Sequence, residues 1–109
     1  MKLLIIVYLF TSLIFLSDLH SSVYKGQKEY MKKCKSCHGN GAKIAKLKTM
    51  EEWKVVFSNN GKILKDLHRN DNKALKYINS ERFKKKSKHM LDFFVKYALD
   101  SGNVPACSD

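Results

Sequence analysis

The stretch Cys34-Lys35-Ser36-Cys37-His38 places two thiols and one imidazole within a single short segment of the chain. Two intervening residues allow one tight turn to present both thiols together, and the imidazole follows directly after them. Apolar residues at three- and four-residue steps predict a helix before this segment, from about Val23 to Cys34. Gly39 and Gly41 predict a loop after it. The segment therefore stands at the junction between a helix and a loop.

This spacing is the pattern of covalent haem attachment. The thiols of Cys34 and Cys37 would form thioether bonds to the two vinyl groups along one porphyrin edge, and His38 would be the proximal ligand of the iron. We predict one haem c per chain, with the glycines of the loop letting the backbone pass close to the haem edge. A redox dithiol and half of a zinc site are alternatives. The first lacks a strand–helix context here, and the second would need Cys107 and scattered histidines.

The first residues follow the order of a secretory signal. Lys2 supplies a basic start, Leu3–Leu16 is apolar apart from two hydroxyl residues, and residues 17–22 turn polar. The apolar run is shorter than the ~20 residues that a spanning helix needs. The sequence therefore predicts export, which would place the protein in the periplasm.

We expect the signal peptide to cover residues 1–22, ending at Ser21 or Ser22, although no clean small-x-small cleavage site is present. A single domain would then cover residues 23–109. The alternative is an uncleaved membrane anchor through residues 3–19. A domain of this size usually needs an additional stabilising element such as a disulfide, a metal or a cofactor, and a covalent haem is one.

The chain is strongly basic, with 21 Lys and Arg against 10 Asp and Glu and a formal net charge of +11. Removal of the leader, which holds Lys2 and Asp18, leaves 20 against 9 and the same net charge. Such a surface attracts nucleic acid, anionic lipid or an acidic protein face. Export and the excess of Lys over Arg argue against nucleic acid. We predict a monomer whose partners are acidic faces of membrane-bound or periplasmic redox proteins, with membrane-surface association as the alternative.

Helices joined by short turns are predicted for the rest of the chain, because Gly is sparse and the single Pro lies near the end. Thr49 is typical of a helix N-cap, and Asn59-Asn60-Gly61 predicts the end of the helix that it starts. The Lys84-Lys85-Lys86 cluster is predicted to be a charged surface before the last helix. The other predicted helices cover three segments: Lys62–His68, Asp71–Asn79 and His89–Asp100. The fold class is therefore all-α, with four to five short helices.

The chain resembles the small mono-haem c-type cytochromes of bacterial export compartments, with the general layout of class I. The resemblance covers the predicted domain: a helix ending in Cys-x-x-Cys-His, a glycine-containing loop, and the closing helix Asp92-Phe93-Phe94-Val95-Lys96-Tyr97-Ala98. It implies a cytochrome c-like fold around one covalent haem, with the first and last helices packed together. It also implies an electron carrier without catalytic residues, which moves single electrons between respiratory redox partners.

The sixth iron ligand of that family is commonly a Met in a Pro-rich loop, and this chain has no such loop. Met90 and Met50 both lie in apolar helical stripes, which favours core packing. His68 shares a helical face with Leu64 and Leu67, so it should point inward and is the candidate sixth ligand. An ordinary core or boundary histidine is the alternative for His68, and Met90 is the alternative ligand.

The identity of the sixth ligand decides the chemistry. Met ligation raises the reduction potential, and bis-His ligation gives a lower one. An open position would bind small ligands, which would make the protein a ligand sensor or a peroxidase-like enzyme. Among the other candidates, His20 belongs to the leader, His89 is expected to be exposed beside the lysine cluster, and Cys107 is an odd thiol in the tail.

Overall fold

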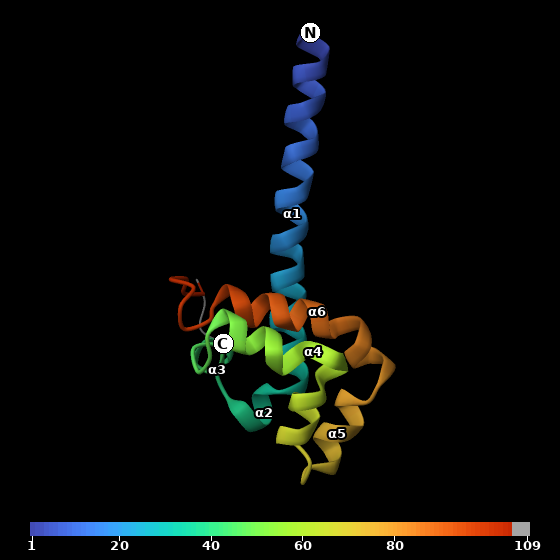
Figure 1. Ribbon diagram of the computed structural model, residues 1–109, viewed down its shortest axis with the longest axis vertical. Helices are drawn as coiled ribbons and strands as arrows, with labels where there is room; N and C mark the ends of the chain where they lie inside the picture. Colours follow the sequence, from blue (N-terminus) through green and yellow to red (C-terminus); the bar gives the residue numbers. More distant parts are fainter. Residues whose placement is uncertain (106–109) are drawn as a thin grey trace.

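The computed structural model describes residues 1–105, with the backbone alone described for residues 9–19. The regular elements of this part are helices: α1 (Lys2–Lys33), α2 (Lys35–His38), α3 (Gly41–Ala45), α4 (Met50–Leu67), α5 (Asn72–Ile78) and α6 (Glu81–Lys96). The all-α fold class is thereby confirmed. Figure 1 shows α1 as a long rod, with the other helices gathered around its C-terminal half. Cys107 lies outside the described residues.

The described residues form more helices than the four to five predicted, because the motif and the segment after it are helical. The motif forms α2, and α3 follows after two residues. Asn40 caps α3, since its Oδ1 accepts hydrogen bonds from the amides of Ala42 at 2.8 Å and Lys43 at 3.3 Å. This cap supplies the partners that the first amides of a helix lack, and it makes a short helix where a loop was expected.

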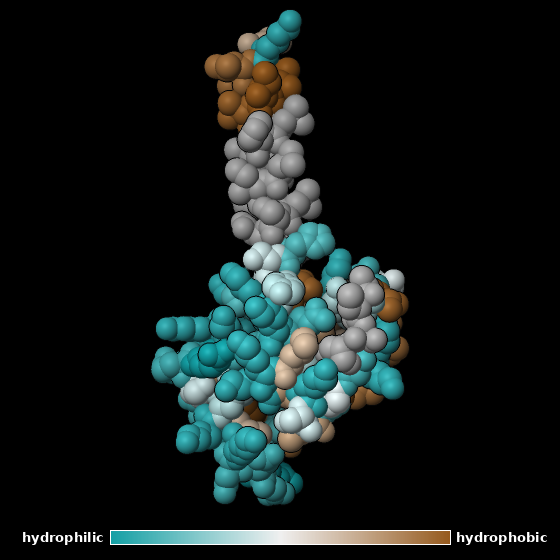
Figure 2. Space-filling model, turned by 180° about the vertical axis from the view of Figure 1, so that it is seen from behind, coloured by the Kyte–Doolittle hydropathy of each residue, from teal (hydrophilic) through white to brown (hydrophobic). Residues whose placement is uncertain are grey.

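The predicted start of the first helix at Val23 is wrong, because α1 begins at Lys2. The apolar leader favours helix, and nothing at Ser21 or Ser22 interrupts it. Leu3 and Tyr8, in the first turns of α1, are 77% and 81% exposed. Figure 2 shows hydrophobic surface exposed at this end of the helix. In the described part of the chain, no helix combines the length and the apolar character that crossing a membrane requires.

Helices α1 and α6 cross in close contact, as the resemblance implied. A Cβ atom on Gly26 would overlap the carbonyl oxygen of His89, so the two backbones touch. Beside this contact, the Ser22 hydroxyl donates a hydrogen bond to Asp92 Oδ2 at 2.5 Å and lies 2.7 Å from His89 Nδ1. His89 is therefore half-buried in the crossing, and the prediction that it is exposed is wrong.

The last helix begins at Glu81, eight residues before the predicted start at His89. Ser80 is the reason, because its hydroxyl accepts a hydrogen bond from the Phe83 amide at 3.2 Å and caps the helix. The Lys84-Lys85-Lys86 cluster consequently lies inside α6 rather than before it. Two of these three lysines are exposed, in agreement with a charged surface.

Helix α4 consists of two helical segments joined at a break. Thr49 and Glu52 form a capping box at its start: the Thr49 hydroxyl accepts from the Glu52 amide, and the Glu52 carboxylate accepts from the Thr49 amide. Asn59, Asn60 and Gly61 all have left-handed backbone angles, with φ between 51° and 73°. The predicted cap and the predicted break are both confirmed.

An aromatic core joins α1, α4 and α6. Trp53 stacks on Phe94 with ring centroids 4.4 Å apart, and its indole N–H donates to the Ala45 carbonyl at 2.8 Å. Burial of each large apolar side chain contributes ~1.5–3 kcal/mol. The buried apolar residues are Val23, Tyr30, Ala45, Trp53, Val56, Phe57, Ile78, Phe83, Met90, Phe93, Phe94 and Ala98. The outer surface of the domain is mostly hydrophilic on the face that Figure 2 shows.

Candidate functional site

The motif forms one helical turn at the C-terminal end of α1. The Cys34 amide donates to the Tyr30 carbonyl at 2.8 Å, and the His38 amide donates to the Cys34 carbonyl at 2.9 Å. Cys34 is half-buried, Cys37 is exposed, and neither forms a disulfide. Both thiols and the imidazole thus lie on a single turn, as the spacing predicted.

The burial of Cys34 bears on whether the two thiols could form a redox dithiol. Desolvation, followed by the nearby Glu29 carboxylate and the Cys37 thiol, raises the pKa of Cys34 to about 12. The reactive cysteine of a redox dithiol needs the opposite, a lowered pKa that exposes the thiolate. This environment therefore disfavours a thioredoxin-like dithiol at this position.

His38 and His68 lie side by side, although thirty residues separate them. Their Nε2 atoms are 3.5 Å apart, and their ring planes meet at 78°. The ring centroids are 5.7 Å apart, only 2.2 Å more than the two nitrogens, so the nitrogens face each other along the line between the rings. The structure thereby brings together the predicted proximal ligand and the candidate sixth ligand.

The tautomer of His68 follows from its second hydrogen bond. Its Nδ1 lies 2.7 Å from the Leu64 carbonyl, which can only accept, so Nδ1 carries the proton. The Nε2 lone pair of the neutral ring is then directed at His38. Metal-ligating histidines almost always donate their other ring N–H to a carbonyl or carboxylate in this way.

The surroundings of His68 differ in part from the expectation. His68 and Leu64 are half-buried, but Leu67 is 64% exposed and does not share an inward face with them. The reason is that α4 ends at Leu67, and His68 is its C-cap with non-helical angles (φ −108°, ψ 16°). The end of the helix turns the imidazole toward α2 instead of toward the core.

A cleft of about 570 Å³ lies between α2 and the turn after α4. This volume is within the ~300–1,000 Å³ range of ligand pockets. Its wall is a mixture of polar and apolar surface, and the cleft is open to solvent. The lining residues are Cys37, His38, Asp66, Leu67, His68, Arg69, Asn70 and Asp71.

The donor atoms at this cleft fit a haem better than a bare metal ion. Bonds of ~2 Å from a metal to each imidazole nitrogen would span about 4 Å between the nitrogens, which is close to the 3.5 Å observed. In the described residues, no three His, Cys, Asp or Glu side chains converge as a zinc site requires. A haem iron needs only two protein ligands, because the porphyrin supplies the other four. His38 and His68 can provide those two, and Cys34 and Cys37 the thioethers.

The two methionines considered as ligands lie elsewhere. Met90 is 2% exposed in the aromatic core, and its sulfur is 3.6 Å from the Tyr77 hydroxyl. Met50 is half-buried against the same core at the start of α4. Neither residue lines the cleft, which agrees with the core packing expected for both.

The two glycines after the motif each have a role in the fold, and their predicted approach to a haem edge stays a prediction. Gly39 has φ 73° and ψ −147°, a conformation that essentially only glycine adopts. A Cβ atom on Gly41 would lie 3.0 Å from Phe93 and 3.1 Å from Tyr30. Gly41 thus lets the backbone pass over these two rings, which are part of the protein core.

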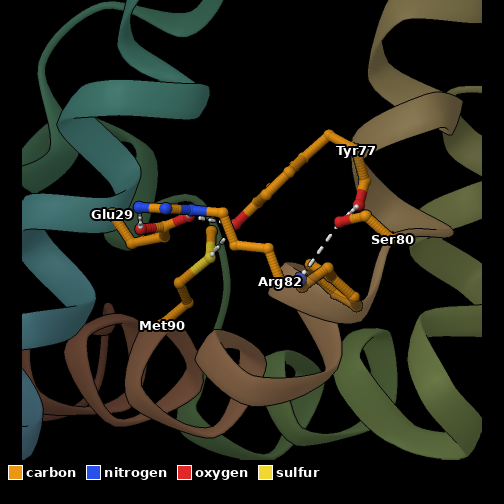
Figure 3. Close-up of polar contacts among 6 residues, drawn as sticks. Glu29, Tyr77, Ser80, Arg82 and Met90 are labelled. Carbon is orange, nitrogen blue, oxygen red and sulfur yellow. Dashed lines mark hydrogen bonds and ion pairs between the residues drawn. The ribbon is translucent and has the colours of Figure 1, made fainter.

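Figure 3 shows a network in which Tyr77 and Arg82 contact the buried carboxylate of Glu29, and the sequence did not predict it. Glu29 is 2% exposed and accepts from Arg82 Nε and Nη2, both at 2.8 Å, and from the Tyr77 hydroxyl at 2.8 Å. The hydrogen bond from Arg82 is the main cause that lowers the pKa of Glu29. Burial, together with the hydrogen bond to Glu29, raises the pKa of Tyr77. These contacts tie α1 to α5 and α6 beside the motif.

Comparison with known proteins gave no match to a family model, to a curated protein or to a solved structure. Function is therefore inferred from the Cys-x-x-Cys-His turn and from the His38–His68 pair.

Proposed function

We propose that this protein is an exported one-electron carrier with a single c-type haem, held by Cys34 and Cys37 and ligated by His38 and His68. The observation that carries the proposal is the 3.5 Å approach of His38 Nε2 to His68 Nε2. It brings the residue that ends a haem-attachment motif to a second imidazole, whose own N–H is already held by the Leu64 carbonyl.

Each group at the site would have one task. The bound haem would supply the change between ferric and ferrous iron. Cys34 and Cys37 fix the porphyrin edge to α1 and α2, so the cofactor stays with the chain. His38 and His68 would be the two protein ligands of the iron, and with both bound no coordination site would remain for a substrate. This arrangement suits electron transfer rather than catalysis, and bis-His ligation implies a lower reduction potential than His–Met ligation.

Positive charge beside the cleft supports an acidic redox partner. A second groove of about 410 Å³ adjoins the cleft, and the two share Asp66 and Arg69. Lys62 and Lys65 also line this groove, and the whole chain carries a net charge of +11. Asp66 and Asp71 offset part of this local positive charge, so the net charge of the whole chain would steer the carrier toward acidic faces of periplasmic or membrane-bound redox proteins. Residues 3–19 would hold the protein at a membrane if the leader is retained.

A pyridine haemochrome assay on protein expressed with export tests the attachment. We expect one thioether-linked haem per chain, and its loss in Cys34→Ser/Cys37→Ser. Ser36→Ala, inside the same turn, is the matched control and should keep the haem. Unmodified thiols in the exported wild-type protein would exclude a c-type cytochrome.

Electron transfer to a candidate acidic redox protein tests the carrier function. The second-order rate should fall steeply as ionic strength rises, because screening weakens steering between opposite charges. A rate independent of salt would remove the acidic-partner part of the proposal. Ready binding of carbon monoxide to the wild-type ferrous protein would instead favour the ligand sensor or peroxidase-like enzyme.

A further inference from the structure

Tyr30 contacts the motif segment at three points. Its carbonyl accepts a hydrogen bond from the Cys34 amide at 2.8 Å, and its hydroxyl donates to the Gly39 carbonyl at 2.7 Å. The Tyr30 ring also lies where the backbone passes at Gly41. The segment from Cys34 to Gly41, which contains His38, thus contacts one residue at three points.

Hydrogen bonds hold both backbone polar groups of Gly39. Its amide donates to the Lys35 carbonyl at 2.8 Å, as the C-cap of α2, and its carbonyl accepts from the Tyr30 hydroxyl at 2.7 Å. The φ of 73° is one of several that glycine adopts freely, and glycine loses much entropy when one is selected. No atom lies within 4 Å of the position that a Cβ would occupy, so a side chain there would meet no neighbour.

Tyr30 itself is held rigidly. It is 1% exposed, and its ring packs edge-on against Phe94, with centroids 5.7 Å apart, and tilted against Phe93 at 6.0 Å. Both phenylalanines belong to α6, the helix that crosses α1. The hydroxyl is therefore presented from the buried aromatic core to the residue that follows His38.

We propose that the Tyr30 hydroxyl is a positioning group for His38, which it orients by holding the Gly39 carbonyl. A phenylalanine would satisfy the core equally well, so the hydroxyl group is what this role requires. The inference rests on the proposed function, since His38 is positioned for an axial bond to a haem iron. Tyr30 touches neither the iron nor a substrate.

The test compares Tyr30→Phe with Tyr24→Phe. Tyr24 lies on the same helix and is 61% exposed, so its variant removes a hydroxyl without touching the motif. Hydrogen exchange of the backbone over residues 35–41 needs no haem. Loss of one hydrogen bond should speed this exchange about fivefold in Tyr30→Phe, and Tyr24→Phe should match the wild type.

The second readout is the electron paramagnetic resonance spectrum of the ferric protein. The g-values of a low-spin haem with two imidazoles depend on the angle between the ring planes, which is 78° here. We expect a single sharp set of g-values in the wild type and in Tyr24→Phe. Tyr30→Phe should give shifted or broadened g-values, because His38 gains freedom to rotate. A merely structural role would leave these values unchanged.

Gly39→Ala gives an independent route to the same result. Its side chain would meet no atom, so any effect arises from the backbone angle alone. We expect the exchange and the spectrum to change as in Tyr30→Phe, and the double variant to be little worse than either single one. Wild-type exchange and g-values in Tyr30→Phe would overturn the proposal. Absence of haem in the wild type would instead overturn the proposed function, and the exchange measurement would still test the contact.

Discussion

A Cβ atom on Gly26 of α1 would overlap the carbonyl oxygen of His89 in α6, because the two helices touch backbone to backbone. This contact sets the distance between the helix that carries the motif and the helix that supplies much of the aromatic core. The short separation is possible only because glycine has no side chain. A side chain at position 26 would consequently force the two helices apart.

Gly26→Ala should destabilise the protein, since the added methyl group forces α1 and α6 apart. Overpacking of this kind typically costs ~1–3 kcal/mol. Urea denaturation followed by far-UV circular dichroism measures the loss. Ser21→Ala, an exposed position on the same helix, is the control and should be neutral or slightly stabilising. Unchanged stability of Gly26→Ala would show that the helices do not meet here.

Glu29→Gln should destabilise the domain by ~1.5–3 kcal/mol, because it replaces a buried carboxylate that accepts hydrogen bonds from Arg82 and Tyr77. Glu81→Gln removes the exposed ion pair with Lys84, which is 2.9 Å long against 2.8 Å for Glu29 and Arg82, and should leave the free energy of unfolding unchanged. The denaturation midpoint of each variant, compared with that of the wild type, measures the loss of stability. Equal effects would mean that Glu29 is not buried in the network.

The same carboxylate should make stability depend on pH in the acid range. Its hydrogen bond from Arg82 lowers the pKa of Glu29 in the folded state, below the ordinary value of 4.5. The unfolded chain then binds the proton more readily, so the contribution is complete above about pH 4.5 and is lost as the pH falls toward the folded-state pKa. The free energy of unfolding, measured from pH 6 to pH 3, should fall more steeply in the wild type than in Glu29→Gln. Parallel curves would refute this assignment.

His89 should produce a second pH dependence with a higher window. Burial, and then Lys88, Lys25 and Lys86, lower the pKa of His89 below 6.5, while Asp92 opposes them. The unfolded chain takes up this proton first, so stability falls as the pH drops through about 6.5 toward the lower folded-state pKa.

His89→Asn tests this second window. Its amide nitrogen can replace the Nδ1–H donor toward Ser22 but does not titrate. The difference in free energy of unfolding between wild type and variant should therefore change between pH 7.5 and pH 5.5. A constant difference would contradict the lowered pKa of His89 in the folded protein.

Local chemistry was enough to predict several parts of the fold. Thr49 starts its helix through a capping box, and Asn59-Asn60-Gly61 interrupts it, because both signals act within a few residues. The predicted start of α6 was too late, because the lysine run at 84–86 favoured a charged surface before the helix. Ser80 was the available signal, since a serine three residues before a buried Phe83 is typical of an N-cap.

Contacts between distant segments could not be predicted in the same way. Nothing in the sequence near Glu29 indicates that Arg82 will neutralise it, because the two meet only after α1 and α6 have crossed. The inward direction of His68 was predicted from helical spacing, but the spacing fails at Leu67, where the helix ends. The meeting of His68 with His38 depends on that helix end, and hence on the fold as a whole.

The optical spectrum of the ferric protein tests the central claim, ligation of one covalent haem by His38 and His68. We expect a six-coordinate low-spin spectrum without a sulfur-to-iron charge-transfer band in the wild type, and the same spectrum in Met90→Ala. His68→Ala should become high-spin and should bind carbon monoxide when reduced, because one axial position is opened. A sulfur-to-iron band in the wild type, or a low-spin spectrum that survives His68→Ala, would contradict the proposed ligation.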